Sequence, residues 1–202
     1  MANGPWTPLI ETWFGDTLAD HEAVAERQDW WFSADSDRDQ RLAADYGDLL
    51  EDCAAGRNYR WLDDIEGRLA LIIALDQLPR NLFRGSPRAF AYDHATAALC
   101  LAAAATGQDH ELLPIQRVFL YMPLQHAEDL QAQTAGVKLY QGLAEDACDW
   151  PEYEEVFLPF AKLHYDIIRR FGRFPHRNAV LGRENTPEEA EYLAGDAPTF
   201  GQ

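Results

Sequence analysis

The feature that most constrains the fold of this chain is an uninterrupted apolar run, Leu69–Leu75. Asp63 and Asp64 precede the run, and aspartate is a favoured N-cap residue, so we expect a helix to begin here. A helix that is apolar on every side has no face for solvent and must be enclosed by other elements. The sequence therefore predicts a buried central helix, and the polar string Asp76–Arg84 that follows it must find partners close to the core.

Helix signals dominate the rest of the chain, whereas the alternation typical of strands is almost absent. Glycine marks several helix ends, at positions 15, 56, 107 and 172. Hydroxyl–proline pairs mark several starts, at Thr7-Pro8, Ser86-Pro87 and Thr186-Pro187. We expect an all-α fold with eight or nine helices, short loops and a single domain over residues 1–202.

Three helix boundaries have consequences for the candidate site. The Ser86-Pro87 start predicts a helix that runs to Gly107, and Pro123 is expected to end or kink a helix that begins near Leu112. A further helix is predicted from about Gln125 to Ala144. His126, Asp129 and Gln133 would then share one face of that helix, because their spacing is i, i+3, i+7.

The charge of the chain is strongly acidic but unevenly distributed. The formal net charge is −17, yet residues 160–183 hold six basic residues and one acid, and residues 77–92 hold three basic residues and no acid. So acidic a protein is not expected to bind nucleic acid, which requires a basic face. No apolar stretch is long enough to cross a membrane, and residues 1–6 do not resemble a secretory signal, so we expect no membrane partner and a cytoplasmic location.

The two basic islands are similar in sequence. Leu78–Gly85 and Arg169–Asn178 each contain a proline, an Arg-Asn pair and a Gly/Arg pair, and each precedes a hydroxyl–proline helix start. Arginine just beyond a helix C-terminus also favours the negative end of the helix dipole, so part of the basic charge has a purely structural explanation.

Polar and charged residues gather in three groups near the ends of apolar helices. The first group is Asp76, Gln77, Arg80, Asn81 and Arg84. The second is Arg117, Tyr121, Gln125, His126, Glu128, Asp129 and Gln133. The third is His164, Arg170, Arg173, His176, Arg177, Asn178 and Arg183.

If the three groups converge, they form a pocket suited to an anion. Arginine binds carboxylate or phosphate through paired hydrogen bonds, and histidine beside a carboxylate can act as a general acid or base. The candidate catalytic residues are His126, Glu128, Asp129 and His176. The candidate ligand-binding residues are Gln77, Arg80, Asn81, Arg84, Tyr121, Arg173, Arg177, Asn178 and Arg183.

Two other interpretations of these residues remain open. They could form an internal ion-pair network that fixes helix packing, with Asp76, Glu128 and Asp129 as partners of the arginines. They could also bind a metal ion, but no His-Glu-x-x-His or paired Glu-x-x-His motif occurs, and the neighbouring arginines would repel a cation. We therefore expect no metal and no cofactor.

Five motifs in their order along the chain resemble a known family. They are Trp13-Phe14-Gly15, Leu75–Asn81, Phe90–Asp93, Tyr121–Asp129 and Phe171–Asn178. Together they resemble the bacterial family called domain of unknown function 924, from about residue 10 to residue 193. The resemblance implies an all-helical fold similar to tetratricopeptide-repeat superhelices, and it implies no established activity.

Two functions follow as hypotheses. The first is a soluble helical protein that binds a small anionic ligand, bearing phosphate or carboxylate, in an Arg/His pocket, and that acts on it as a hydrolase or transferase. The second is a non-enzymatic interaction module that binds a protein partner and uses the same motifs as structural salt bridges. The sequence leaves open whether the protein is an enzyme.

Overall fold

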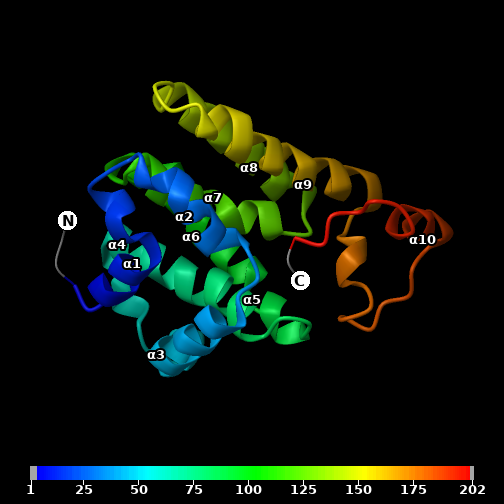
Figure 1. Ribbon diagram of the computed structural model, residues 1–202, viewed down its shortest axis with the longest axis horizontal. Coiled ribbons are helices and arrows are strands. Elements are labelled where there is room, and N and C mark those ends of the chain that lie inside the picture. The colour runs from blue at the N-terminus through cyan, green and yellow to red at the C-terminus, as the bar shows by residue number, and fades with distance from the viewer. Residues whose placement is uncertain (1–3, 201–202) are drawn as a thin grey trace.

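The computed structural model describes residues 4–200, and within that range it contains helices and no strand (Figure 1). Two π-helical turns, Ile73–Gln77 and Tyr153–Phe157, run directly into the helices that follow them. The α-helices are α1 Thr7–Phe14, α2 Ala23–Phe32, α3 Ser36–Ala54, α4 Ile65–Ile72, α5 Leu78–Leu82, α6 Asp93–Thr106, α7 Pro114–His126, α8 Leu130–Asp146, α9 Leu158–Phe171 and α10 Pro187–Leu193. Since α4, its π turn and α5 are continuous, the described range contains nine α-helical segments besides short 3-10 turns, which confirms the predicted all-α fold. Residues 1–3, part of the segment examined for a secretory signal, lie outside it.

Two central helices form the core. Every residue from Leu69 to Asn81 is buried, as the apolar run predicts, and so is every residue of α7 from Ile115 to Gln125. α7 packs against α4, α6 and α8, α9 lies along α8, and α3 covers α5 (Figure 1). None of the helices of the described chain is both long enough and apolar enough to cross a membrane.

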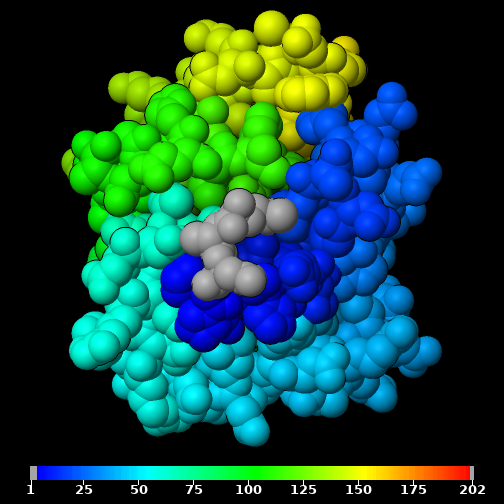
Figure 2. Space-filling view, turned by 90° about the vertical axis from the view of Figure 1, so that its left-hand side faces the viewer, coloured from blue at the N-terminus to red at the C-terminus, as the bar shows by residue number. Residues whose placement is uncertain are grey.

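Aromatic rings join the N-terminal helices to α7. The ring of Phe119 lies edge-on to Trp13 at 5.7 Å, to Phe14 at 5.4 Å and to Trp31 at 4.9 Å between centroids. The Trp31 indole also donates a hydrogen bond to the Trp13 carbonyl at 2.8 Å. On the face drawn in Figure 2, α1 occupies the centre and α2 borders it. These contacts fix the C-terminal end of α2 beside the middle of the molecule.

The two π turns have the same local cause. Each is followed by a Leu-Pro pair, Leu78-Pro79 and Leu158-Pro159, and the leucine amide bonds to the carbonyl five residues earlier, in Ile73 and Tyr153. Proline lacks the N–H of an α-helical bond, and its ring collides with the carbonyl four residues earlier. Widening one turn to the i−5 pattern separates that carbonyl from the ring. Both helices therefore continue through a proline that would otherwise break them.

Several predicted helix boundaries are confirmed and two are wrong. Asp64 caps α4, and Thr186 forms a capping box with Glu189 at α10. Of the two effects expected of Pro123, it does not end the helix, since α7 continues to His126. Ser86 caps only a short 3-10 turn, and α6 begins at Asp93 rather than at Pro87.

The second error concerns the helix predicted from Gln125. α7 ends at His126, and α8 begins at Leu130 with Asp129 as its N-cap. His126 and Asp129 therefore do not share a helix face, because one helix ends and the next begins between them.

The C-terminal part of the chain, from Gly172 onwards, folds against the end of α9 (Figure 1). Arg173 pairs with Glu189 at 2.6 Å, and Arg170 pairs with Glu188 at 2.8 Å. Phe171 packs against Tyr192, with ring centroids 4.9 Å apart. These contacts attach α10 to α9.

Two helical glycines provide a matched test of the packing. A Cβ on Gly67 would collide with the backbone carbonyl oxygen of Trp61 and approach the Trp6 ring at 3.1 Å, whereas a Cβ on Gly47 meets nothing within 4 Å. We expect Gly67→Ala to lower the free energy of unfolding by about 1–3 kcal/mol. Gly47→Ala is expected to raise it by about 0.5–1 kcal/mol, because alanine is the better helix former. Urea denaturation measures both, and a stabilised Gly67→Ala variant would contradict the packing of α4.

Candidate functional site

A cavity of about 390 Å³ opens between the two central helices and the segments that cover them. One side is polar and comes from the first π turn, α5 and α7, and the other side is mainly aromatic and comes from α2, the second π turn, α9 and the C-terminal tail. The lining residues are Gln28, Asp29, Trp31, Phe32, Gln77, Arg80, Asn81, Arg84, Met122, Gln125, His126, Val156, Phe157, Phe160, His164 and Phe200.

Asp76 is the most deeply buried charged group beside this cavity. It lies in the first π turn and is 0% exposed. His126 Nδ1 is 2.8 Å from its Oδ1, and Gln77 Nε2 donates to its Oδ2 at 2.5 Å. The guanidinium of Arg80 lies 3.2 Å from Oδ1. A buried carboxylate is tolerated only with partners of this kind.

The surroundings of Asp76 and His126 determine their protonation. Burial opposes ionisation of Asp76, but the positive charge of Arg80 and the hydrogen bonds from His126 and Gln77 outweigh it and lower the pKa of Asp76. Burial lowers the pKa of His126, and the nearby Arg80 lowers it further against the opposing effect of Asp76. His126 is therefore neutral at pH 7, its Nδ1–H donates to Asp76, and its Nε2 carries a lone pair.

A second imidazole, that of His164, lines the cavity and also carries its proton on Nδ1. His164 Nδ1 lies 2.7 Å from the Phe160 carbonyl, which can only accept, so Nδ1 carries the proton. Burial lowers the pKa of His164 to about 3, which keeps the ring neutral. The His126 and His164 rings are 6.2 Å apart, and Phe200 lies against His164 at 4.1 Å between centroids.

Asp93 joins the two basic islands. Its Oδ1 accepts from Arg80 Nη2 at 2.8 Å, and its Oδ2 accepts from Arg177 Nη1 at 2.9 Å. The Arg177 guanidinium lies between the rings of Phe90 and Phe174, at 4.4 Å from each centroid. Sequence reasoning did not assign a role to Asp93, although it belongs to one of the five family-like motifs and lies in the first turn of α6.

Asn81 and Arg84 form the outer part of the polar side. Asn81 Nδ2 donates to the Gln77 carbonyl at 2.9 Å, and its Oδ1 accepts from Arg84 Nη2 at 2.9 Å. Arg84 Nε donates to Asp39 of α3 at 2.8 Å. The five predicted site residues that line the cavity are thus Gln77, Arg80, Asn81, Arg84 and His126.

Most of the third polar group forms a separate network beyond Phe174. Glu128 accepts from Arg183 Nη1 at 2.6 Å and from the Phe174 amide at 2.8 Å, and these bonds lower the pKa of Glu128 against the effect of its burial. Asn178 Oδ1 accepts from Arg183 Nε at 2.9 Å, while Arg173 pairs with Glu189. These residues lie outside the cavity lining and hold the C-terminal segment in place.

His176 also lies outside the lining. Its ring lies 5.5 Å from that of Phe174 and 5.3 Å from that of Phe200 between centroids. Burial, with a contribution from the neighbouring Arg177, lowers its pKa to about 4. His176 therefore contributes a neutral ring to the packing around Phe200.

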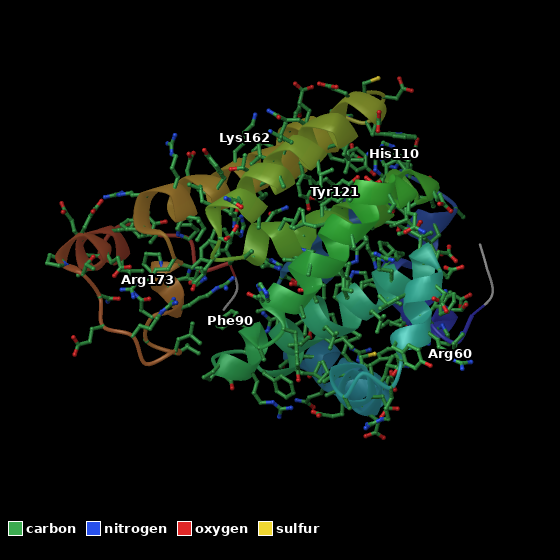
Figure 3. All side chains as sticks on the ribbon, turned by 180° about the vertical axis from the view of Figure 1, so that it is seen from behind. Arg60, Phe90, His110, Tyr121, Lys162 and Arg173 are labelled. Carbon is green, nitrogen blue, oxygen red and sulfur yellow. The ribbon has the colours of Figure 1, made fainter. Side chains whose placement is uncertain are left out.

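Tyr121 and Asp129 have different neighbours again. The Tyr121 hydroxyl donates to Asp109 at 2.5 Å and accepts from Arg117 Nε at 3.0 Å. Figure 3 shows Tyr121 between His110 at one end of the molecule and Arg173 near the other. Asp129 accepts from the Ala132 amide at 2.7 Å as the cap of α8. The structure therefore brings the first group together with His126 and His164, and it places the remaining candidates in networks outside the cavity.

Sequence reasoning did not identify the aromatic side of the cavity. Trp31, Phe32, Phe157, Phe160 and Phe200 come from three distant parts of the chain. Nothing in their local sequence distinguishes them from ordinary core residues, so only the approach of α2 to the second π turn, where Phe32 meets Phe157, reveals them. Among the described residues, no group of three or more His, Cys, Asp or Glu side chains is arranged to hold a metal ion.

Sequence comparison places this arrangement in a known group of proteins. The family described as bacterial protein of unknown function (DUF924) matches residues 9–197. The chain belongs to this family. The match spans all five motifs, so the buried Asp76–His126 pair and the Asp93 bridge are formed by residues of the family region.

A solved structure is similar to this fold. It is that of a protein of unknown function from Agrobacterium tumefaciens, with a TM-score of 0.74 and 37% sequence identity, and the match covers 86% of this chain and 98% of that one. A comparison with curated proteins gave no match. The likeness to tetratricopeptide-repeat superhelices stays a prediction.

The importance of the Asp76 charge can be measured directly. Asp76→Asn keeps the shape of the side chain but removes the negative charge that Arg80 faces. We expect it to lower the free energy of unfolding by about 3–5 kcal/mol, as breaking a buried ion pair does. The control is Asp52→Asn in the exposed pair with Arg57, for which we expect about 1 kcal/mol or less. Equal losses in urea denaturation would show that Asp76 is not the central charge described here.

The neutral buried imidazole of His164 predicts a pH dependence of stability. Its pKa falls from about 6.5 to about 3 on folding, so between these values the unfolded chain binds a proton that the folded protein does not. Stability is then lost as pH falls through this window, by up to about 1.36 kcal/mol per pH unit for this residue. We expect His164→Gln to reduce the slope of unfolding free energy between pH 6.5 and pH 4. The same change at the exposed His94 is the control, and an unchanged slope in His164→Gln would contradict the assignment.

Proposed function

We propose that the cavity binds a small anionic ligand and that His126 moves a proton during its conversion, which would make the protein a hydrolase or transferase. The observation that carries the proposal is the Asp76–His126 pair at the wall of a ligand-sized cavity. A carboxylate that accepts from Nδ1 orients the imidazole and stabilises the imidazolium that forms when Nε2 takes a proton. Among the described residues, the hydrogen bonds of the His126 ring go through Nδ1, so the lone pair of Nε2 can accept a proton.

We take water or a second substrate as the nucleophile, although the carboxylate of Asp29 also lines the cavity. Among the described residues that line the cavity there is no serine, threonine, cysteine, tyrosine or lysine. In the proposed step, His126 Nε2 takes a proton from water while the water oxygen bonds to the carbonyl or phosphoryl centre of the ligand. The imidazolium then returns the proton to the leaving group. Asp76 stays ionised throughout.

Arg80, Arg84 and Asn81 are the proposed anion-binding residues, with Gln77 beside them. Asp76 and Asp93 hold Arg80, and Asp39 and Asn81 hold Arg84, so each guanidinium is oriented before a ligand arrives. A guanidinium has five N–H donors and can bind several acceptors in its plane. We assign Arg177, Arg183 and Glu128 the role of positioning the segments around the cavity through their ion pairs. The interaction-module hypothesis would also predict these ion pairs.

Thermal unfolding with small anions tests the proposal. At 100 times its Kd a ligand stabilises a protein by about 2.7 kcal/mol, which corresponds to a rise in Tm of about 5–10 °C for a chain of this size. We expect a rise of this order with a carboxylate or phosphate ligand for the wild type and a smaller rise for Arg84→Ala. Arg173→Ala, which removes an arginine outside the cavity, should respond as the wild type does.

A second measurement addresses the proton transfer. With a p-nitrophenyl ester or phosphate that the wild type hydrolyses, His126→Gln should lower kcat by about 10²–10⁴-fold with little change in KM. If no anion raises the Tm of the wild type more than it raises the Tm of the Arg84→Ala variant, the anion site is refuted. If anions bind but His126→Gln leaves kcat unchanged, the catalytic role of His126 is refuted and the anion site stands.

A further inference from the structure

The two sides of the cavity differ in chemistry. The first π turn, α5 and α7 contribute Arg80, Arg84 and His126, whereas α2, the second π turn, α9 and the C-terminal tail contribute the rings of Phe32, Phe157, Phe160 and Phe200 together with Trp31. A ligand that consisted of an anionic group alone would contact only the polar side. The aromatic side therefore requires its own explanation.

Part of the aromatic side is not covered by the rest of the chain. Phe32 is 48% exposed and Phe160 is 50% exposed, although both are large apolar side chains. Trp31 and Phe157, next to them on the cavity wall, are buried. Exposed apolar side chains that continue into a cavity and border polar groups are typical of ligand-binding surfaces.

The rings of this wall are held by neighbours. Phe32 stacks on the buried Phe119, with centroids 6.2 Å apart and planes at 7°, and lies 6.5 Å from Phe157. Phe200 lies 4.1 Å from His164. Phe32 and Phe200 are therefore held in place before a ligand binds, and an apolar group can pack on them without first ordering these two side chains.

We propose that the ligand is a small amphipathic acid whose alkyl chain or aromatic ring packs between Phe32, Phe157, Phe160 and Phe200. This inference rests on the proposed anion site, which holds the acidic group of the same molecule. Because the acidic group lies at Arg80 and Arg84, the apolar group extends towards α2 and α9. Phe160 is then a specificity-determining residue that acts on the apolar group alone.

A series of straight-chain carboxylates from acetate to octanoate, with benzoate and phenylacetate beside it, tests this inference by calorimetric titration of the full chain. Each added methylene should raise the affinity by about fourfold, which corresponds to about 0.8 kcal/mol, until the cavity is filled. The two aromatic acids show whether a ring fits as well as a chain. Phe160→Ala should weaken octanoate by about tenfold or more and leave acetate unchanged.

Leu163→Ala is the matched control, because Leu163 is 38% exposed on the same helix and does not line the cavity. It should bind the whole series as the wild type does. Affinity that does not depend on chain length, or a Phe160→Ala variant that binds octanoate as tightly as the wild type, would overturn the inference while leaving the anion site intact. Hexanol that binds as tightly as hexanoate would refute the anion site and support the apolar wall. No binding by any acid would refute both.

Discussion

The structure depends on keeping one carboxylate ionised in the core. Asp76 is 0% exposed and lies where the two most buried helices meet, so it needs both a buried positive charge and hydrogen-bond donors. Arg80 supplies the positive charge from α5, and the neutral His126 donates a hydrogen bond from α7. Arg80 is also shared with Asp93, which in turn holds Arg177. A single buried charge thus links the central helices, the start of α6 and the C-terminal segment.

Most arginines of the basic motifs form ion pairs in this network, and fewer of them line the cavity. The second basic island lies apart from the lining, and its arginines pair with Asp93, Glu128 and Glu189. The first island, by contrast, lies on the cavity wall. The similarity between the two islands reflects how a helix with arginines at its end is joined to its neighbours, and it does not indicate two equivalent binding sites.

The fold could be predicted because its signals are local. The apolar run and the caps at Asp64 and Thr186 act within one or two helical turns, and the structure confirms them. Local signals do not decide the course of the chain where tertiary packing dominates: Pro123 stays inside α7 because that helix is buried on all sides. The site was predicted in part, since His126 and Arg80 are recognisable by type. Asp93 and the aromatic wall could not be predicted, because their roles depend on contacts between distant segments.

The π turn at Ile73–Gln77 has a consequence for how the length of this helix can vary. A π turn contains one residue more than the α-helical pattern requires, and one residue corresponds to about 100° of rotation about the helix axis. Loss of a single residue here would leave a helix with ordinary geometry. It would also rotate the apolar half, Leu69–Ile72, relative to Arg80 by about a quarter of a turn. The shortened chain could then keep either the packing of Leu69–Ile72 in the core or the ion pairs of Arg80, but not both. The number of residues in this segment is therefore fixed by the need to keep both sets of contacts.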